Sequence, residues 1–289
     1  MDYQGTVIRP PSEAGSIILQ VTVGCSHNRC TFCGAYKDEP FRYKDQAIIA
    51  ADLAYAARFF PDNSRLFLAD GDVLTIPQHR LLALMDSIRE QLPAVRRIRL
   101  YGNGKSIRSK SLADLQALKD RGLDRIYMGL ESGDEEVLAA IKKGNTAQQL
   151  IAAARKVREA GIFLSITVLL GIGGLGGSSR HAIATAQVLN QMYPNQIAAL
   201  TVMPIPGTPL HNDIVQGRFQ LPDELAMLQE LKTLVSHITL DRVQFQANHA
   251  SNFLPLDCRL VRDRETVLAW IDQAIAGEIP LMPDYMRAL

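Results

Sequence analysis

The chain has 289 residues, a formal net charge of +1 and 47% hydrophobic residues, a composition that allows a large folded core. This charge balance gives no general electrostatic attraction to nucleic acids or anionic membranes. The most apolar stretch, residues 162–175, is interrupted by Ser165 and several glycines and is too short to cross a bilayer. We expect a cytoplasmic protein, because residues 1–5 lack the basic and apolar regions of a signal peptide.

Apolar runs of strand length alternate with helical patterns along most of the sequence. The runs fall at residues 17–23, 65–69, 97–101, 124–130, 163–170 and 196–203. Helical patterns fall at residues 45–59, 78–91, 112–119 and 146–161, and a fifth ends near Met192. This alternation predicts parallel strands joined by right-handed crossover helices. The predicted fold is therefore α/β, a partial (β/α)6 TIM-type barrel.

The pattern changes after Pro209. An amphipathic helical spacing covers residues 221–238, a possible added strand covers 243–246, and a closing helix is expected at 263–276. We therefore predict three parts: an N-terminal arm (1–15), the partial barrel (16–210) and a C-terminal α-helical and β extension (211–289) that caps the barrel.

Three cysteines, Cys25, Cys30 and Cys33, lie in one loop directly after the first predicted strand, with the spacing C-x4-C-x2-C. The remaining cysteine, Cys258, is far along the chain. Three local thiolates are one short of the four that close a structural zinc site or an ordinary electron-transfer cluster. A metal centre held by three ligands keeps an open position, which is typical of sites that do chemistry.

Two other interpretations of the cysteines stay open. A plant-type 2Fe-2S ferredoxin has the same spacing and a distant fourth cysteine, so Cys258 as a fourth ligand would make an iron-sulfur electron-transfer protein. A zinc-stabilised binding protein is the second alternative. The long β/α pattern favours a site of chemistry, because an electron carrier does not require it.

Glycine-rich polar segments follow the other predicted strands. They lie at residues 70–72, 102–105, 131–133 and 171–174. Sites in such folds gather at the carboxyl ends of the strands, where the cysteine loop also falls. One such segment alone is more often a simple turn. Their recurrence on the side of the thiolates predicts a cavity for a polar ligand, with Asn103 among its contacts.

The cysteine loop resembles that of the radical S-adenosylmethionine (SAM) superfamily, and the likeness covers most of residues 17–210. In that family, three cysteines hold a 4Fe-4S cluster whose fourth iron binds S-adenosylmethionine. The resemblance thus implies Cys25, Cys30 and Cys33 as cluster ligands, with Phe32 as the usual aromatic residue before the last cysteine. The first gap is one residue longer than in the commonest spacing, C-x3-C-x2-C.

The resemblance also implies cofactor contacts after the second strand. Asp70, Gly71 and Asp72 stand where the family has a Gly-Gly-Glu-Pro segment that binds the ammonium group of the cofactor. The first glycine and the proline of that segment are absent here.

Further contacts are implied after the later strands. Glu131 and Ser132 belong to a segment similar to a fourth-strand motif near the ribose or methionine moiety. Lys143 is a candidate partner of the cofactor carboxylate, or else an ordinary solvated lysine. Gly171 falls in a segment that resembles the adenine contact of the fifth strand. Met203 falls in one that resembles the sixth-strand exit of the oxygen-independent coproporphyrinogen oxidase-like branch.

The chemistry that the resemblance implies is reductive cleavage of S-adenosylmethionine. The resulting 5'-deoxyadenosyl radical abstracts a hydrogen atom from the substrate, so the protein would be a radical enzyme served by a reductant such as flavodoxin or ferredoxin. No catalytic acid or base is identified in the sequence. We expect a small or medium-sized organic substrate, because the chain shows no appended basic module that would support a nucleic-acid partner.

A polar cluster near the C-terminus is the candidate substrate contact. Asn248, His249, Ser251 and Asn252 lie between two phenylalanines in the predicted extension. The alternative is a turn in which these side chains bond the local backbone.

Overall fold

The structure is a computed structural model that describes residues 1–288, without the side chain of residue 261. The chain forms two compact units, which we describe separately. The first comprises Met1–Asn28, Ala35–Met128 and Arg155–Leu164, and the second comprises Arg29–Gly34, Gly129–Ala154 and Ser165–Leu289. The chain passes between the units on either side of Arg29–Gly34, in the segment of the cysteines, and again within β6, α6 and β7.

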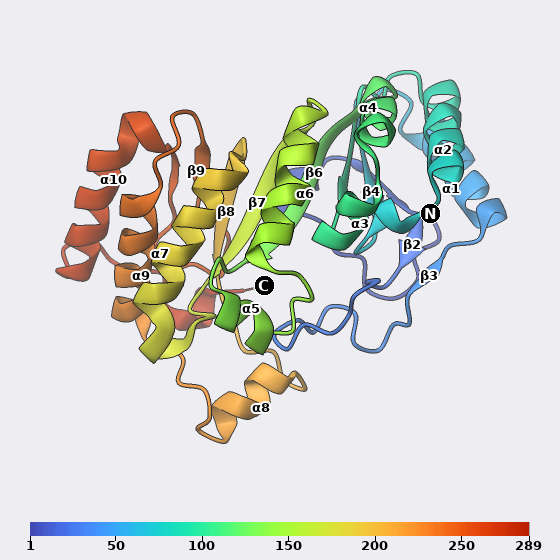
Figure 1. The fold of residues 1–289 in the computed structure, drawn as a ribbon. Coiled ribbons are helices and arrows are strands. Elements are labelled where there is room, and N and C mark those ends of the chain that lie inside the picture. Colours follow the sequence, from blue (N-terminus) through green and yellow to red (C-terminus); the bar gives the residue numbers. More distant parts are fainter. Residues whose placement is uncertain (289) are drawn as a thin grey trace. The chain divides into compact units, whose positions relative to one another are not determined.

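The first unit is built on parallel strands in the order β1-β4-β5-β6, of which Figure 1 labels β4 and β6. These strands are β1 (Ile17–Gln20), β4 (Arg65–Ala69), β5 (Arg97–Tyr101) and β6 (Leu123–Glu131). The connecting helices are α1 (Gln46–Phe59), α2 (Gln78–Gln91), α3 (Gly104–Ser109) and α4 (Leu112–Asp120). Short 3-10 turns lie at η1 (Pro11–Glu13) and η2 (Val73–Thr75). The apolar run of β4 is fully buried from Leu66 to Ala69, as expected for a strand covered on both faces.

The second unit contains β7 (Phe163–Leu170), β8 (Gln196–Thr201), β9 (Gln244–Gln246) and β10 (Asp257–Arg259). β7, β8 and β9 are parallel, and β10 pairs antiparallel with β9. Its helices are α5 (Glu135–Ala140), α6 (Ala147–Glu159), α7 (Gly174–Met192), α8 (Pro209–Val215), α9 (Glu224–His237) and α10 (Leu260–Ile275), and η3 (Asp284–Met286) follows. Helix α9 packs against both α7 and α10 (Figure 1).

The α/β fold class predicted from the sequence is confirmed. The predicted strands at 65–69, 97–101 and 163–170 match β4, β5 and β7 in their bounds. The first predicted strand differs, because it is divided into β1 and the two-residue β2 (Thr22–Val23). β2 leaves the main sheet and pairs antiparallel with β3 (Arg42–Tyr43). Between them, the backbone N–H of Val21 still donates to the carbonyl of Ala69.

The sequence did not predict three short helices, α3, α5 and α8. The N-cap residue of each has a side-chain oxygen that accepts backbone N–H groups of the first turn: Asn103, Asp134 and Thr208. Such capping satisfies donors that a helix start leaves unpaired. Helices of six or seven residues are too short to show a hydrophobic period, so only the capping residue marks them.

The N-terminal segment packs tightly on the first unit. Val7 contacts the cluster of Phe67, Ala69 and Tyr127. The buried carboxylate of Glu13 lies 2.7 Å from Arg99 Nη1 and accepts a hydrogen bond from the Tyr127 hydroxyl. The segment is therefore part of the core of this unit.

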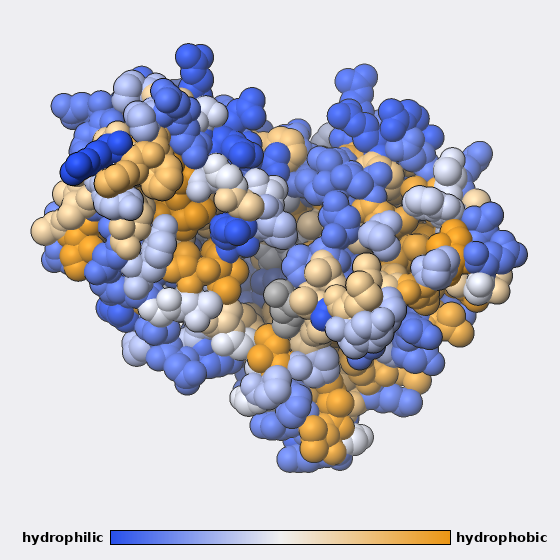
Figure 2. Space-filling view, turned by 180° about the vertical axis from the view of Figure 1, so that it is seen from behind, coloured by the Kyte–Doolittle hydropathy of each residue, from blue (hydrophilic) through white to orange (hydrophobic). Residues whose placement is uncertain are grey.

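The surface carries dispersed apolar residues. Figure 2 shows hydrophobic patches that are interrupted by hydrophilic residues over the face that it draws. Across residues 1–288, no helix is long and apolar enough to span a bilayer.

Candidate active site

In the first unit, the loop that follows β4 carries two buried carboxylates. Asp70 Oδ1 accepts a hydrogen bond from the Tyr36 hydroxyl at 2.7 Å, and Oδ2 accepts one from Gln20 Nε2 at 3.0 Å. Burial raises the pKa of Asp70, although these hydrogen bonds act in the opposite direction. Asp70 therefore joins β1, the end of β4 and the segment after the cysteine loop.

Asp72 is the second buried carboxylate of this loop. It accepts hydrogen bonds from Ser26 Oγ at 2.6 Å, Asn103 Nδ2 at 2.5 Å and Ser106 Oγ at 2.5 Å. Burial raises the pKa of Asp72 as well, against the effect of these donors. Because Ser26 follows Cys25 directly, Asp72 fixes the first half of the cysteine loop against the start of α3. The predicted contacts of Asp70 and Asp72 with the cofactor stay predictions.

Gly71 lies directly against Cys25. A Cβ atom on Gly71 would lie 2.9 Å from Cys25 Cβ and 3.1 Å from the carbonyl oxygen of Gly24. Only glycine allows so close an approach. The loop after β4 thus forms a cradle for the first cysteine, whose own side chain is half-buried.

The other half of the cysteine loop belongs to the second unit. Thr31 is buried, its N–H donates to the carbonyl of Ile141 at 3.0 Å, and its carbonyl accepts the N–H of Leu210 at 3.0 Å. A Cβ on Gly34 would lie 2.7 Å from Ile205 Cγ2. These contacts hold the backbone around Cys30, Phe32 and Cys33, whose side chains are half-buried.

The four thiols differ in environment. None of them, all within the described part of the chain, forms a disulfide. Cys258 is buried in β10, and its burial, followed by Asp263 and Asp257, raises its pKa to about 11. A thiol that keeps its proton is a poor metal ligand. Within residues 1–288, no three histidine, cysteine or acidic side chains are placed to hold a metal ion, so the site of Cys25, Cys30 and Cys33 stays a prediction.

Glu131 and Lys143 form an ion pair in the second unit. Lys143 Nζ lies 2.8 Å from Glu131 Oε1, and both side chains are 11% exposed. Glu131 ends β6 with a left-handed backbone (φ 64°). A Cβ on Gly129 would lie 2.1 Å from Glu131 Oε1, so the glycine makes room for the carboxylate. Lys143 is therefore held by a carboxylate of the protein, and its predicted contact with a cofactor carboxylate is untested.

Ser132 begins a buried chain of polar side chains. Its hydroxyl lies 2.8 Å from His181 Nδ1, and His181 Nε2 lies 3.4 Å from Glu230 Oε1. Glu230 Oε1 also accepts the backbone N–H of Gly171 at 2.6 Å. Sequence analysis did not identify His181 or Glu230. The available signal was a glutamate on the apolar face of α9, between Met227 and Leu231.

Gly171 follows β7 and has a left-handed backbone (φ 83°). A Cβ at this position would lie 2.2 Å from Met227 Cε. Two further backbone contacts involve this loop: Gly174 N–H donates to Gly171 at 3.1 Å, and Leu175 N–H donates to Gln220 at 2.8 Å. The predicted adenine-binding loop is thus enclosed by residues of the C-terminal part of the chain.

The predicted substrate residues divide into two pairs. Ser251 and Asn252 are buried and bond the end of β8: Thr201 N–H donates to Ser251 Oγ at 3.2 Å, and the Thr201 hydroxyl donates to Asn252 Oδ1 at 2.9 Å. Asn248 is exposed, and His249 is half-buried with a pKa lowered by burial. His249 Nδ1 accepts the backbone N–H of Ser251 at 3.1 Å and lies 2.9 Å from the Ser251 hydroxyl, as in the turn alternative, so Asn248 is the most exposed of the four. Met203, just beyond β8, is also half-buried.

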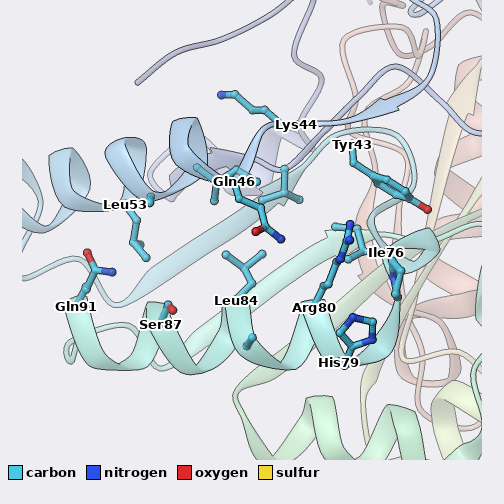
Figure 3. Close-up of a pocket in the computed structure, with 15 residues that line it drawn as sticks. Tyr43, Lys44, Gln46, Leu53, Ile76, His79, Arg80, Leu84, Ser87 and Gln91 are labelled. Atoms are coloured by element: carbon cyan, nitrogen blue, oxygen red, sulfur yellow. The ribbon is translucent and has the colours of Figure 1, made fainter.

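A pocket of about 330 Å³ lies between α1 and α2 in the first unit. Figure 3 shows Gln46 and Leu53 of α1 and Arg80 and Leu84 of α2 around the same gap. None of the predicted cluster or cofactor residues lines it. This pocket is therefore separate from the loops described above.

Comparison with known proteins identifies the relatives of the chain. It is 26% identical to tRNA-2-methylthio-N(6)-dimethylallyladenosine synthase of Coxiella burnetii over 259 residues, which cover 84% of this chain and 54% of that protein. The chain thus spans about half the length of this curated relative.

Solved structures share the fold at low sequence identity. Coproporphyrinogen III oxidase (HemN) from Escherichia coli, a radical SAM enzyme, aligns with a TM-score of 0.59 and 18% identity over 87% of this chain and 58% of that one. The radical SAM methyltransferase TsrM from Kitasatospora setae, solved with cobalamin and a [4Fe-4S] cluster, gives 0.58 and 17% over 70% of this chain and 39% of its own.

The family assignment comes from a family-wide comparison. The model of the Radical SAM superfamily matches residues 19–186, which is more than half of the chain and includes the cysteine loop and the exits of β4 to β7. The chain therefore belongs to the Radical SAM superfamily.

Proposed function

We propose that this protein is a radical SAM enzyme that binds a 4Fe-4S cluster through Cys25, Cys30 and Cys33 and reductively cleaves S-adenosylmethionine. The 5'-deoxyadenosyl radical then abstracts a hydrogen atom from a small or medium-sized organic substrate. The observation that carries this proposal is the three-cysteine loop within the matched family region. A [4Fe-4S] cluster is bound in the related structure of TsrM.

The residues around the cysteines fit such a cluster. Three half-buried thiols in one loop would supply three ligands and would leave one metal position open. Gly71 gives Cys25 a neighbour without a side chain, where a Cβ would lie 2.9 Å from Cys25 Cβ. The fourth cysteine, Cys258, has a raised pKa, which argues against the ferredoxin-like alternative.

Bound there, the cluster would supply the electron that breaks a carbon-sulfur bond of S-adenosylmethionine. The residues of the chain then have positioning tasks. Asp72 orients the loop of Cys25 through Ser26, and Asp70 fixes the adjoining backbone. Glu131 neutralises Lys143 in its half-buried position, and Gly171 lets the loop after β7 pack closely against Met227. Hydrogen-atom transfer requires no general base, which agrees with the absence of an identified catalytic dyad.

We assign different tasks to two successive parts of the chain. Residues 16–210 would bind the cofactors, and residues 211–289 would cap the site and contribute substrate contacts such as Asn248 and His249. Ser251 and Asn252 would support those contacts through β8. A flavodoxin or ferredoxin would serve as the reductant.

A nucleoside in RNA is the second candidate substrate. The observation that favours it is the similarity to a tRNA-modifying synthase over 84% of this chain. The formal charge of +1 gives it no support. Both substrate classes therefore belong in the assay.

The proposal is tested by anaerobic reconstitution with iron and sulfide. We expect a reduced-cluster EPR signal that changes when S-adenosylmethionine is added, and release of 5'-deoxyadenosine under reducing conditions. Metabolite extract and bulk tRNA are added in separate arms to detect the substrate class. Replacing Cys25, Cys30 and Cys33 together by alanine should abolish iron binding, whereas Cys258→Ala should retain it. Iron content that is unchanged in the triple variant would overturn the proposal, and zinc without sulfide would indicate the zinc-stabilised alternative.

A further inference from the structure

Glu230 is a buried acidic residue on α9, far in the sequence from the loops that it contacts. Its side chain is 0% exposed. Oε1 accepts the backbone N–H of Gly171 at 2.6 Å, and Oε2 accepts the hydroxyl of Ser178 in α7. One carboxylate thus ties the end of β7 to the first turns of the following helix.

The contact with His181 extends this link to the end of β6. Burial lowers the pKa of His181 to about 4, so its imidazole is neutral near neutral pH. Its Nδ1 lies 2.8 Å from the Ser132 hydroxyl, which in turn accepts the N–H of Asp134 at 3.0 Å. We assign the imidazole proton to Nε2, with the Ser132 hydroxyl donating to Nδ1, because Nε2 is the ring nitrogen that faces a carboxylate. Nε2 lies 3.4 Å from Glu230 Oε1, and the imidazole also forms a hydrogen bond with the backbone of Leu169.

Glu230 holds a loop that is already tightly packed on its other sides. Gly171 is pressed between Met227 and Val202, where a Cβ would lie 2.2 Å and 3.2 Å from their side chains. Removal of the carboxylate would leave the buried Gly171 N–H and the half-buried Ser178 hydroxyl without their acceptor. Unsatisfied buried donors are costly, so the loop would rearrange.

We propose that Glu230 is a positioning residue for S-adenosylmethionine: it holds the β7 exit loop directly, and the β6 exit through His181 and Ser132, in the geometry that binds the cofactor. The inference rests on the proposed function and deepens it. Ser132 and Gly171 are two of the cofactor contacts implied by the family resemblance, and they are the two ends of this single buried chain. The C-terminal extension thereby controls cofactor affinity through α9.

Glu230 can accept the Gly171 N–H whether or not its carboxyl group is ionised. Burial raises its pKa to about 7, although the hydroxyl of Ser178 and the N–H of Gly171 act in the opposite direction. Near neutral pH, Glu230 is therefore ionised in some molecules and protonated in others. In both forms it has an oxygen that accepts the Gly171 N–H. A glutamine resembles the protonated state and keeps an oxygen acceptor.

The test compares Glu230→Ala and Glu230→Gln with the wild type and with Glu224→Ala, an exposed glutamate on the same helix. In reconstituted protein, equilibrium dialysis measures the Kd for S-adenosylmethionine, and iron content is measured in parallel. We expect Glu230→Ala to raise the Kd at least tenfold with unchanged iron, Glu230→Gln to stay within threefold of the wild type, and Glu224→Ala to have no effect. Rescue by glutamine distinguishes positioning through an acceptor from a requirement for charge.

A second readout does not depend on any cofactor. Amide hydrogen exchange in the iron-free protein reports whether the Gly171 N–H is protected, and we expect at least tenfold faster exchange at residues 171–178 in Glu230→Ala only. An unchanged Kd in Glu230→Ala, or unchanged exchange, overturns the inference while the cluster and its cleavage reaction stand. If the wild type itself binds no iron or no S-adenosylmethionine, the proposed function fails first, and the inference fails with it. If Glu230→Ala does not fold, failure of Glu230→Gln to bind like the wild type overturns the inference.

Discussion

The polar groups at the β4 exit and those at the β6 and β7 exits are fixed in different ways. After β4, neutral donors from nearby loops surround the carboxylates: Asp72 is bonded by Ser26, Asn103 and Ser106. After β6 and β7, the groups are held by an ion pair of Glu131 and by Glu230, a residue of another helix. The first region thus depends on its own loops, and the second depends on the C-terminal extension.

The comparison suggests which part of the site can vary without loss of the cluster. Changes in the β4 loop should act on the thiolates, because Gly71 and Asp72 adjoin Cys25 and Ser26. Changes at Glu230 should act on cofactor affinity, because it contacts Gly171 and lies on the path to Ser132. Four predictions test this separation.

The largest effect is expected for Asp72→Ala. Ser26, Asn103 and Ser106 would lose a common acceptor in a buried place, so the free energy of unfolding should fall by about 3 kcal/mol. Iron content after reconstitution should fall as well, because the anchor of Ser26 beside Cys25 is lost. Urea denaturation and iron analysis measure the two effects. Asp38→Ala, an exposed residue of the loop after the cysteines, should change neither. If Asp72→Ala keeps the stability and the iron content of the wild type, the β4 loop does not act on the cysteines, and the distinction between the two regions is wrong.

The second prediction concerns the pH dependence of stability in the β7 region. Burial raises the pKa of Glu230 from 4.5 to about 7, so this group contributes stability that is present below pH 4.5 and lost as the pH rises through 7. Burial lowers the pKa of His181 from 6.5 to about 4, so its contribution is present above pH 6.5 and lost as the pH falls through 4. Between pH 4.5 and 6.5, the stability that Glu230 contributes therefore falls as the pH rises, whereas the stability that His181 contributes increases.

Replacement of Glu230 by glutamine removes one of these opposing contributions. As the pH rises from 4.5 to 7, the free energy of unfolding of Glu230→Gln should increase by up to about 3 kcal/mol relative to that of the wild type. As the pH falls below 6.5, the free energy of unfolding of Glu230→Gln itself should decrease, because His181 remains. Urea denaturation at several pH values measures both. A difference between the two proteins that does not change with pH would show that Glu230 titrates normally.

The sequence was sufficient to predict the bounds of β4, β5 and β7 and the loop after β4, and insufficient to predict the contacts of Glu230. Residues 65–69 form a nearly continuous apolar run that is followed at once by Asp70, Gly71 and Asp72, so the local sequence predicts both the strand and the loop. Glu230 lies 59 positions from Gly171, and its role depends on how α9 packs, which local periodicity does not specify. The separation of β2 from β1 was also hidden, because Val21 continues the apolar pattern while its backbone changes partners.

The third prediction concerns Gly71→Ala. The added methyl group would lie 2.9 Å from Cys25 Cβ and 3.1 Å from the Gly24 carbonyl, so the backbone of the cysteine loop must move. We expect about 2 kcal/mol of destabilisation and a lower iron content. Gly176→Ala is the matched control, because its Cβ would have no neighbour within 4 Å and alanine favours the helix. Equal iron content in both variants would show that the β4 loop does not position Cys25.

The smallest effect is expected for the ion pair of Glu131 and Lys143. Lys143→Met removes the cation beside the buried carboxylate of Glu131, and Glu131→Gln removes the anion beside the Lys143 ammonium, so each should cost about 1 kcal/mol of folding stability. The double variant should cost less than the sum of the two, because no charge is left unpaired. Urea denaturation of the four proteins gives this coupling energy. The same proteins separate a structural pair from a cofactor contact: if Lys143 serves only Glu131, the Kd for S-adenosylmethionine in the double variant should match the wild type. A raised Kd in the double variant at wild-type stability would instead assign Lys143 to the carboxylate of the cofactor, as the family resemblance implies.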